Sequence, residues 1–464
     1  MGDVAFRRWL CGVFALFASL RLAVYLLFPM DWSLVYWRWQ NLDVAELREN
    51  FVEAIFHCHQ QPPLWNVFVA LNVKIFPDSF GAIPFQCEYA ILSIGAFFLM
   101  LSILRQFNFR KGVMLLAMGL YSILPAVLYS ERWLAYTFPL TFMLLLCTKL
   151  MLDTLTKTGV WRFYALCLAL ACVVLSRSFF HVFLWMLPLL LLGLFGIHRN
   201  GEKISRHVVF PLICLLVAIL PYFMNFARYG IFSSSTWLGA NLARTLRYVT
   251  PAEKSRLYEQ GLVSELAMEP PFSSDFERHE RLLGAQKPTG ISILDKRLKS
   301  ATHPNRKAYV NMNNRTIPWI AKEQAKLWKV AIIVYPGKYL LAVSNAIFMF
   351  FSEGMDLYWN TGHWFPWHSD SRCLFILKTV RYLFAPVGVF MFMMFGVLGF
   401  LRAARMPATR VFALFCLFNV MYVFGVSCCF ELGEQLVMRV PIEPLIVIGI
   451  AFLVSHILNR PHQP

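Results

Sequence analysis

The chain has 464 residues, of which 58% are hydrophobic and only 15% are charged, and its mean hydropathy is +0.56. A soluble protein carries roughly 25% charged residues because its surface must be solvated, so this composition excludes a soluble globular fold and indicates an integral membrane protein. The net charge of +17 does not indicate a nucleic-acid partner, because the basic residues stand in short clusters between apolar runs.

The apolar runs predict an all-α polytopic membrane fold. A spanning helix needs roughly 20 apolar residues. About ten runs reach this length within a few residues at each end: 9–29, 84–104, 112–129, 134–153, 162–178, 181–197, 207–225, 382–401, 410–428 and 440–457. With both termini in the cytoplasm, every basic cluster between the runs falls on the cytoplasmic side, as the positive-inside rule requires. The first run follows Arg7 and Arg8 and is typical of a retained signal anchor.

Two shorter apolar stretches are predicted to lie on the outer interface. Residues 64–76 follow a proline pair and contain Lys74, and residues 339–351 follow Pro336-Gly337. Counting either as a single span would invert every later loop and place basic clusters outside. Both are therefore predicted as interfacial helices, and the alternative that one of them spans stays open.

The predicted topology divides the chain into three parts. Residues 1–225 form an N-terminal transmembrane module, whose first exterior loop, residues 30–83, holds candidate catalytic residues. Residues 226–381 form an exterior and interfacial subdomain, because residues 250–325 hold most of the polar sequence. Residues 382–464 supply the last transmembrane helices.

The first exterior loop is rich in acidic residues. Asp31 follows the first span directly, and four later acids are spaced as on one amphipathic helix, namely Asp43, Glu46, Glu49 and Glu53. A carboxylate at the membrane edge is desolvated, which raises its pKa and suits it to act as a general base. The alternative for Asp31 is a structural role in which it caps the following helix.

The order of these residues resembles a known superfamily. Asp31 is followed about 25 to 30 residues later by His59-Gln60-Gln61-Pro62-Pro63-Leu64. This pattern resembles the GT-C superfamily of polyprenyl-phosphate-sugar-dependent glycosyltransferases, and within it the protein O-mannosyltransferase and aminoarabinose-transferase branch. The link Tyr129–Trp133 and the segment Arg439–Pro444 are similar to further motifs of that superfamily. The likeness covers the first seven spans better than it covers residues 226–381.

The resemblance implies roles for three residues. Asp31 would be the catalytic base, His59 the histidine of the H-x-x-P-P-L motif and Glu131 the acid of the second exterior link. Members often carry two acids where this chain has Asp31-Trp32. A divalent cation is therefore possible but not favoured, because such an ion wants several oxygen ligands, and no cofactor or metal site is predicted.

The implied reaction moves a sugar from a polyprenyl-phosphate donor in the membrane to an exterior acceptor, with inversion at the anomeric carbon. The acceptor, whether protein, lipid or glycan, is not specified by the sequence. A bacterial inner membrane is favoured by the terminal motif, and the endoplasmic reticulum also fits.

A departing lipid phosphate needs cationic partners at the outer membrane edge. The candidates are Arg177, Arg228, Lys338 and Arg439. Arg177 can instead snorkel to the interface. Arg439 can instead be neutralised by Glu431, Glu434 or Glu443. Arg21, inside the first span, is expected to pair with an acid of a neighbouring helix rather than with substrate.

Two further segments combine aromatic and polar residues. In the segment 232–241, Trp237 is a candidate for stacking on a sugar and Asn241 for bonding its hydroxyls, although an ordinary interfacial loop anchored by tryptophan fits equally well. The aromatic run Trp359–His368 contains two histidines five residues apart and favours a structural role over a metal site.

Two rival functions remain open. A transporter or flippase for a lipid-linked or small polar solute would show inverted repeats, broken helices and ionisable residues at mid-bilayer. The sequence instead shows largely uninterrupted spans and carboxylates gathered at one face. A non-catalytic subunit of a membrane complex is the third possibility.

Overall fold

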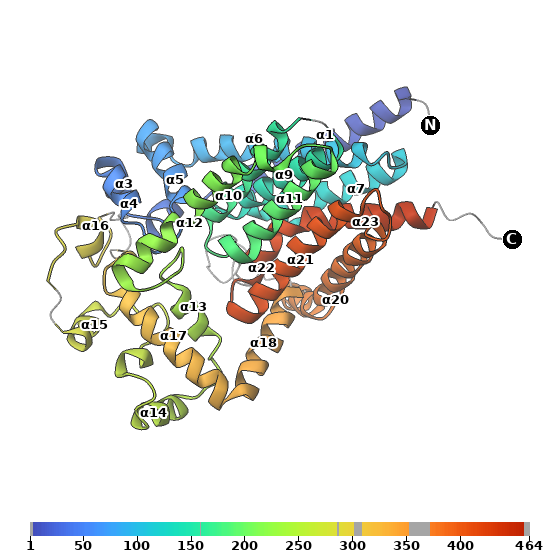
Figure 1. Cartoon of the computed structure of the whole chain (residues 1–464). Helices are drawn as coiled ribbons and strands as arrows, with labels where there is room; N and C mark the ends of the chain where they lie inside the picture. Colours follow the sequence, from blue (N-terminus) through green and yellow to red (C-terminus); the bar gives the residue numbers. More distant parts are fainter. Residues whose placement is uncertain (1–2, 158, 285–286, 301–308, 352–371, 459–464) are drawn as a thin grey trace.

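The computed structural model describes residues 3–157, 159–284, 287–300, 309–351 and 372–458. Within these ranges the regular structure is helical, and the strand pairing is limited to one isolated bridge between Leu298 and Val310. The expected all-α class is therefore confirmed for the described residues (Figure 1).

Among the described residues, seven helical segments are long and apolar enough to cross a membrane. They are α1 (Asp3–Leu27), α6 (Ile83–Gln106), α9 (Thr137–Thr156), the π-turn Val182–Met186 with α11 (Leu187–Arg199), α12 (Val209–Tyr229), α21 (Arg410–Phe430), and the end of α22 (Gln435–Arg439) with α23 (Glu443–Leu458). An eighth results if α17 (Ile317–Val334) and α18 (Pro336–Phe351), which are bent by 107° at Tyr335, form one span. The chain is thus a multi-pass membrane protein, and the larger count of about ten remains a prediction.

The other three predicted spans also fall on helices, one of which is interrupted and one of which is short. Residues 112–129 form α7 (Lys111–Ile123) and α8 (Pro125–Ser130), because Pro125 lacks an N–H and disfavours a helical conformation at Leu124. Residues 162–178 form α10 (Trp161–Ser176), which is short for a span. Residues 382–401 lie within α20 (Arg372–Ala403).

The first exterior loop folds into short helices. The predicted single helix from Asp43 to Glu53 is wrong, because the chain breaks at Asn50 into α3 (Val44–Glu49) and α4 (Phe51–Phe56). The stretch 64–76 forms α5 (Leu64–Ile75), which has 12 residues and is shorter than a spanning helix.

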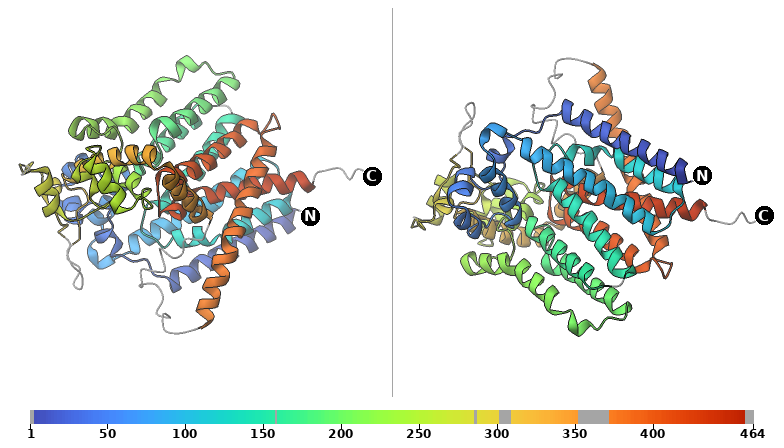
Figure 2. Two further views of the ribbon diagram at one scale, coloured as in Figure 1. Left: turned by 90° about the horizontal axis from the view of Figure 1, so that it is seen from below. Right: turned by 90° about the horizontal axis from the view of Figure 1, so that it is seen from above.

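The two ends of the helical bundle differ. Both termini lie at one end, whereas α3, α4 and the small helices of residues 238–295 gather at the opposite end (Figures 1 and 2). These small helices are α13 (Leu238–Arg244), α14 (Pro251–Glu259), α15 (Phe276–Leu283) and α16 (Ser292–Asp295). The loops predicted to be exterior therefore share one end of the molecule.

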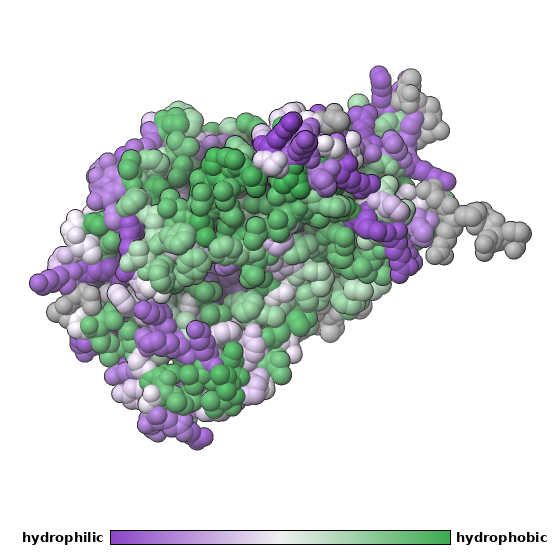
Figure 3. Space-filling model, viewed as in Figure 1, coloured by the Kyte–Doolittle hydropathy of each residue, from purple (hydrophilic) through white to green (hydrophobic). Residues whose placement is uncertain are grey.

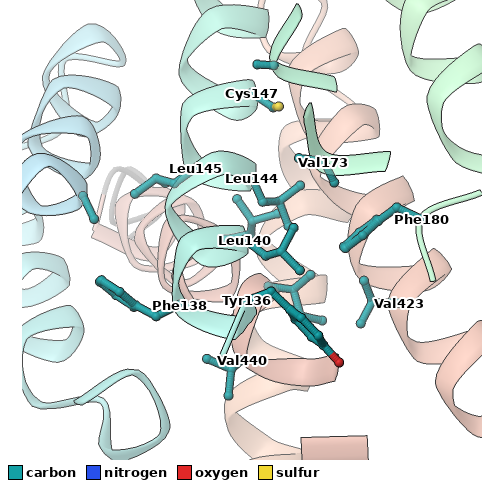
Figure 4. Close-up of a cluster of buried hydrophobic side chains, with 14 of the residues drawn as sticks. Tyr136, Phe138, Leu140, Leu144, Leu145, Cys147, Val173, Phe180, Val423 and Val440 are labelled. Atoms are coloured by element: carbon teal, nitrogen blue, oxygen red, sulfur yellow. The ribbon is translucent and has the colours of Figure 1, made fainter. Parts of the chain in front are cut away.

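The centre of the bundle is built around α9. Its buried side chains face residues of α10, of the link 177–181, of α21 and of the turn Val440–Ile442, as shown for Leu140, Leu144, Val173, Phe180, Val423 and Val440 (Figure 4). Tyr136 directly precedes α9 and lies at that end of this part of the core.

A buried ion pair joins α1 to the second exterior link. Arg21 Nη2 lies 3.0 Å from Glu131 Oε1, and its Nη1 donates to the Ser122 carbonyl at 2.6 Å. Both side chains are almost fully buried. The expectation that Arg21 pairs with a neighbouring acid is confirmed.

Glycines allow α20 and α23 to touch backbone to backbone. A Cβ added at Gly399 would overlap the Gly449 carbonyl oxygen, and one added at Gly396 would press on Ile446. Helices in lipid gain packing energy from such small residues. This contact explains how α23 becomes the most buried of the spanning segments.

Gly399→Ala should therefore destabilise the protein by about 1–3 kcal/mol, the usual cost of overpacking. Gly388→Ala on the same helix is the matched control, because a Cβ there meets nothing within 4 Å. Thermal unfolding in detergent, followed by labelling of the buried Cys147 and Cys416, measures both. Equal melting temperatures for the two variants would contradict the close contact.

Candidate functional site

A cavity of about 260 Å³ lies between the ends of long apolar helices and the small helices at the end of the molecule opposite to the termini (Figure 1). Its walls combine α13, the links 177–181 and 431–434, and loops around residues 39–40, 61 and 232–237. On the face of the molecule shown in Figure 3, hydrophobic residues cover most of the bundle and enclose a small hydrophilic hollow. The cavity brings together segments that are distant in sequence.

Two arginines and two glutamates line this cavity: Arg177, Arg244, Glu431 and Glu434. Arg177 is 5% exposed, donates from Nη2 to Glu434 Oε2 at 3.0 Å and lies over the Tyr136 ring at 4.4 Å. Its side chain lines the cavity. The predicted cation at position 177 is therefore in place, but it already has an anionic partner.

A glycine in the link between α21 and α22 lies in contact with Arg244. Gly433 has a φ of 102°, a conformation that side chains other than glycine rarely adopt. A Cβ at Gly433 would collide with the Arg244 guanidinium. The glycine thus permits both the tight turn between Glu431 and Glu434 and the close approach of Arg244 to it.

The two carboxyl groups have opposite pKa shifts. Burial and the charge of Glu434 raise the pKa of Glu431 above its ordinary value, against the opposing effect of Arg177 and Arg244. Burial also raises the pKa of Glu434, but Arg177, Arg244 and Arg38 outweigh burial and hold it below its ordinary value. One carboxyl therefore retains a proton over the pH range in which its neighbour is charged.

A histidine of defined tautomer also lines the cavity. His181 Nδ1 accepts the backbone N–H groups of Phe183 and Leu184 at 3.2 and 3.4 Å, so the ring proton resides on Nε2. Burial lowers the pKa of His181. The side chain is therefore a neutral hydrogen-bond donor beside the charged groups.

Trp237 and Asn241 both line the cavity, so the two candidate sugar-contacting residues lie together. Trp237 is buried, and its Nε1 donates to the Met312 carbonyl at 3.3 Å. Trp39 and Phe272 complete an aromatic wall on this side.

Asp31 and His59 do not line the cavity. Asp31 Oδ1 accepts the Ser33 backbone N–H at 2.9 Å and the Ser33 hydroxyl at 2.6 Å, which matches its alternative, structural role. His59 is fully buried and bonds Thr236 Oγ1 and the Asn313 carbonyl, both at 2.8 Å. Burial lowers the pKa of His59 to about 3, so this neutral ring joins the first exterior loop to two later loops.

The other predicted residues also lie elsewhere. Glu131 forms an ion pair with Arg21. Arg439 forms an ion pair with Glu443 at 2.9 Å, which is one of the neutralising partners proposed for it from the sequence. Arg228 donates to the Phe56 carbonyl at 3.1 Å, and Lys338 forms an ion pair with Glu253. Of the four candidate phosphate-binding cations, the cavity contains Arg177.

The sequence interpretation missed Arg244, Glu431 and Glu434 as site residues. The available signal was two acids in a link of only a few residues between long apolar runs, because ionisable groups at membrane depth are functional candidates. No comparable signal marks Arg244, which ends a short helix of mostly small and apolar residues.

No group of three or more His, Cys, Asp or Glu side chains is placed to hold a metal ion in the part of the chain that the structure describes. The run Trp359–His368, for which a structural role was favoured, lies outside the described residues. Comparisons with family models, curated proteins and solved structures returned no match. The resemblance to the GT-C superfamily remains a prediction.

Glu431→Gln and Glu434→Gln should change stability in opposite directions at alkaline pH. A carboxyl with a raised pKa lowers stability as the pH rises from its unfolded value of about 4.3 to its folded value. Glu431→Gln should therefore raise the melting temperature at about pH 8 and change it little at about pH 4, below that window. Glu434, with a lowered pKa, stabilises the fold above its unfolded pKa, and its loss leaves Arg177 unpaired. Melting curves at both pH values measure this, and equal losses for the two variants at about pH 8 would contradict the opposite shifts.

Proposed function

We propose that this chain is a membrane glycosyltransferase that moves a sugar from a polyprenyl-phosphate donor to an acceptor at the outer membrane edge, and that the reaction takes place in the Arg177/Arg244/Glu431/Glu434 cavity. The observation that carries the proposal is the pairing of a carboxyl of raised pKa with cations in one cavity at the ends of apolar helices. A general base and a seat for a phosphate are the two groups that such a transfer needs.

The charge of the cavity suits an anionic ligand. When Glu431 is protonated, the two arginines outnumber the one charged carboxylate, Glu434, and the four lining groups carry a net positive charge. The donor phosphate binds in this state, and Glu431 must lose its proton before it can act as the general base. Among the described residues Arg244 forms no ion pair, although its charge acts on both carboxyl groups. Its guanidinium fork matches phosphate oxygens, so Arg244 is the first partner of the donor phosphate and Arg177 the second.

The donor enters from the bilayer. The cavity lining includes four apolar side chains that are themselves exposed, namely Leu184, Phe232, Leu238 and Phe430, at 64%, 44%, 44% and 43%. Leu184 and Phe430 belong to segments apolar enough to span the membrane. A polyprenyl tail leaving the cavity on this side would stay in contact with apolar surface and lipid.

The chemistry is a single displacement. Glu431 takes the proton of the acceptor hydroxyl while that oxygen forms a bond to the anomeric carbon. The bond from that carbon to the phosphate oxygen breaks, and the electron pair leaves with the phosphate, whose charge Arg244 and Arg177 stabilise. The base is assigned to Glu431 instead of Asp31, because Asp31 lies outside the cavity and is bonded to Ser33.

Glu431→Gln should lower kcat for sugar transfer from a polyprenyl-phosphate sugar by about 10²–10⁴, the usual contribution of a general base. Asp31→Asn should keep kcat within several-fold of the wild type. Glu53→Gln, at an exposed position of the first exterior loop, is the control for loss of an exterior carboxyl. The measurement is transfer in detergent with a panel of polyprenyl-phosphate sugars.

The outcomes separate the competing assignments. Loss of transfer in Asp31→Asn with full transfer in Glu431→Gln would return the base to the position implied by the family resemblance. Movement of a labelled lipid-linked sugar across vesicles without any transfer would favour the flippase instead.

A further inference from the structure

Phe272 has an unusual backbone conformation. Its φ is 61°, and the other non-glycine residue with positive φ in the described ranges is Asn108. Asparagine tolerates this left-handed region, whereas a bulky aromatic residue rarely adopts it. A phenylalanine therefore occupies a position where glycine would be less strained, which points to a role for its ring.

The ring belongs to an aromatic wall of the cavity. It stacks on Trp39 with centroids 5.7 Å apart and an interplanar angle of 28°, and it meets Trp237 edge-on at 5.3 Å and 79°. Trp39 is 45% exposed whereas Trp237 is 3% exposed. The accessible indole of the wall is therefore that of Trp39, and Phe272 packs between it and the buried indole of Trp237.

The wall lies on the extramembrane side of the cavity. Trp39 is in the first exterior loop between α2 (Leu34–Trp37) and α3, and Phe272 is in the loop that precedes α15. These helices gather at the end opposite to the termini (Figure 1). The apolar entrance at Leu184 and Phe430 belongs instead to the membrane helices.

Polar groups stand beside the wall. Asn241 and Gln61 line the same cavity, and Gln61 Oε1 accepts a hydrogen bond from Ser178 Oγ at 3.2 Å. A flat aromatic face beside amide groups suits a pyranose ring, whose C–H face is apolar and whose equatorial hydroxyls both donate and accept hydrogen bonds. Tryptophan supplies a large rigid surface for such contact.

We infer that Trp39 and Phe272 form the acceptor side of the cavity and that the acceptor is a saccharide. This inference rests on the proposed function, in which Glu431 must receive a proton from an acceptor hydroxyl. A saccharide seated on the wall approaches Glu431 from the extramembrane side, and the donor approaches from the bilayer. Protein and lipid acceptors become outcomes of the test.

The test measures binding of free disaccharides to the full-length chain in detergent, by saturation-transfer NMR, without requiring turnover. The probes are mannobiose, maltose, lactose and chitobiose, with a serine- and threonine-containing peptide as the competing class. At least one disaccharide should bind the wild type, and its dissociation constant should rise at least tenfold in Trp39→Ala. Trp161→Ala, which removes a 62% exposed tryptophan from α10, should change nothing.

Phe272→Gly and Phe272→Ala separate the binding role from the fold. Both remove the ring, so both should weaken disaccharide binding at least tenfold. The glycine variant should melt at a higher temperature than the alanine variant, because glycine adopts the positive φ without strain. Binding losses of equal size in two variants of unequal stability, measured below both melting temperatures, are not caused by unfolding.

Two results would overturn the inference. One is binding of the peptide but of none of the disaccharides, and the other is disaccharide binding unaffected by Trp39→Ala. Either result leaves the proposed function standing, because that function is tested by the Glu431→Gln transfer assay. Absence of transfer together with intact disaccharide binding would identify the proposed function as the part that failed.

Discussion

The organisation of the polar end depends on charge compensation in one cavity. Four ionisable groups from α13 and two short links meet where the membrane helices end, and burying any one of them alone would cost several kcal/mol. The Arg177–Glu434 pair compensates two charges. The charges of the remaining two groups are compensated differently: Glu431 can bind a proton, and Arg244 can bind an external anion. A base and an anion-binding group in one cavity suit the proposed chemistry, and Gly433 allows Arg244 to approach the link that carries both glutamates.

The first exterior loop supports this cavity. His59 is bonded to residues of two loops far along the chain, and the Gln60 carbonyl accepts a hydrogen bond from Ser235 Oγ at 2.5 Å. Gln61, next in sequence, reaches the cavity itself. His59 therefore holds in place the loop that carries Trp237, through its hydrogen bond to the neighbouring Thr236. Its neutrality follows from burial, so it contributes hydrogen bonds rather than charge.

Sequence patterns predicted the helical class and the gathering of the loops, because apolar length and basic flanks are local properties. They also placed Arg177, Trp237 and Asn241 at the site. They did not predict the break at Asn50, nor the division of residues 112–129 at Pro125 into two helices. Arg244 and Glu431 were missed because their meeting depends on how α13 packs against a link almost 190 residues away. For Arg439 the sequence already offered Glu443 among three neutralising partners, and the packing selects it. For Arg21 the sequence predicted an acidic partner, and only the packing identifies that partner as Glu131.

The central claim is that this cavity holds the phosphate of a polyprenyl lipid. Native mass spectrometry of the full chain with added undecaprenyl phosphate tests it directly, with undecaprenol as the neutral analogue. The account predicts preferential retention of the phosphate lipid by the wild type and at least tenfold weaker retention by Arg244→Met, with Arg228→Met, outside the cavity, unchanged. Equal retention of the neutral alcohol, or undiminished binding in Arg244→Met, would contradict it.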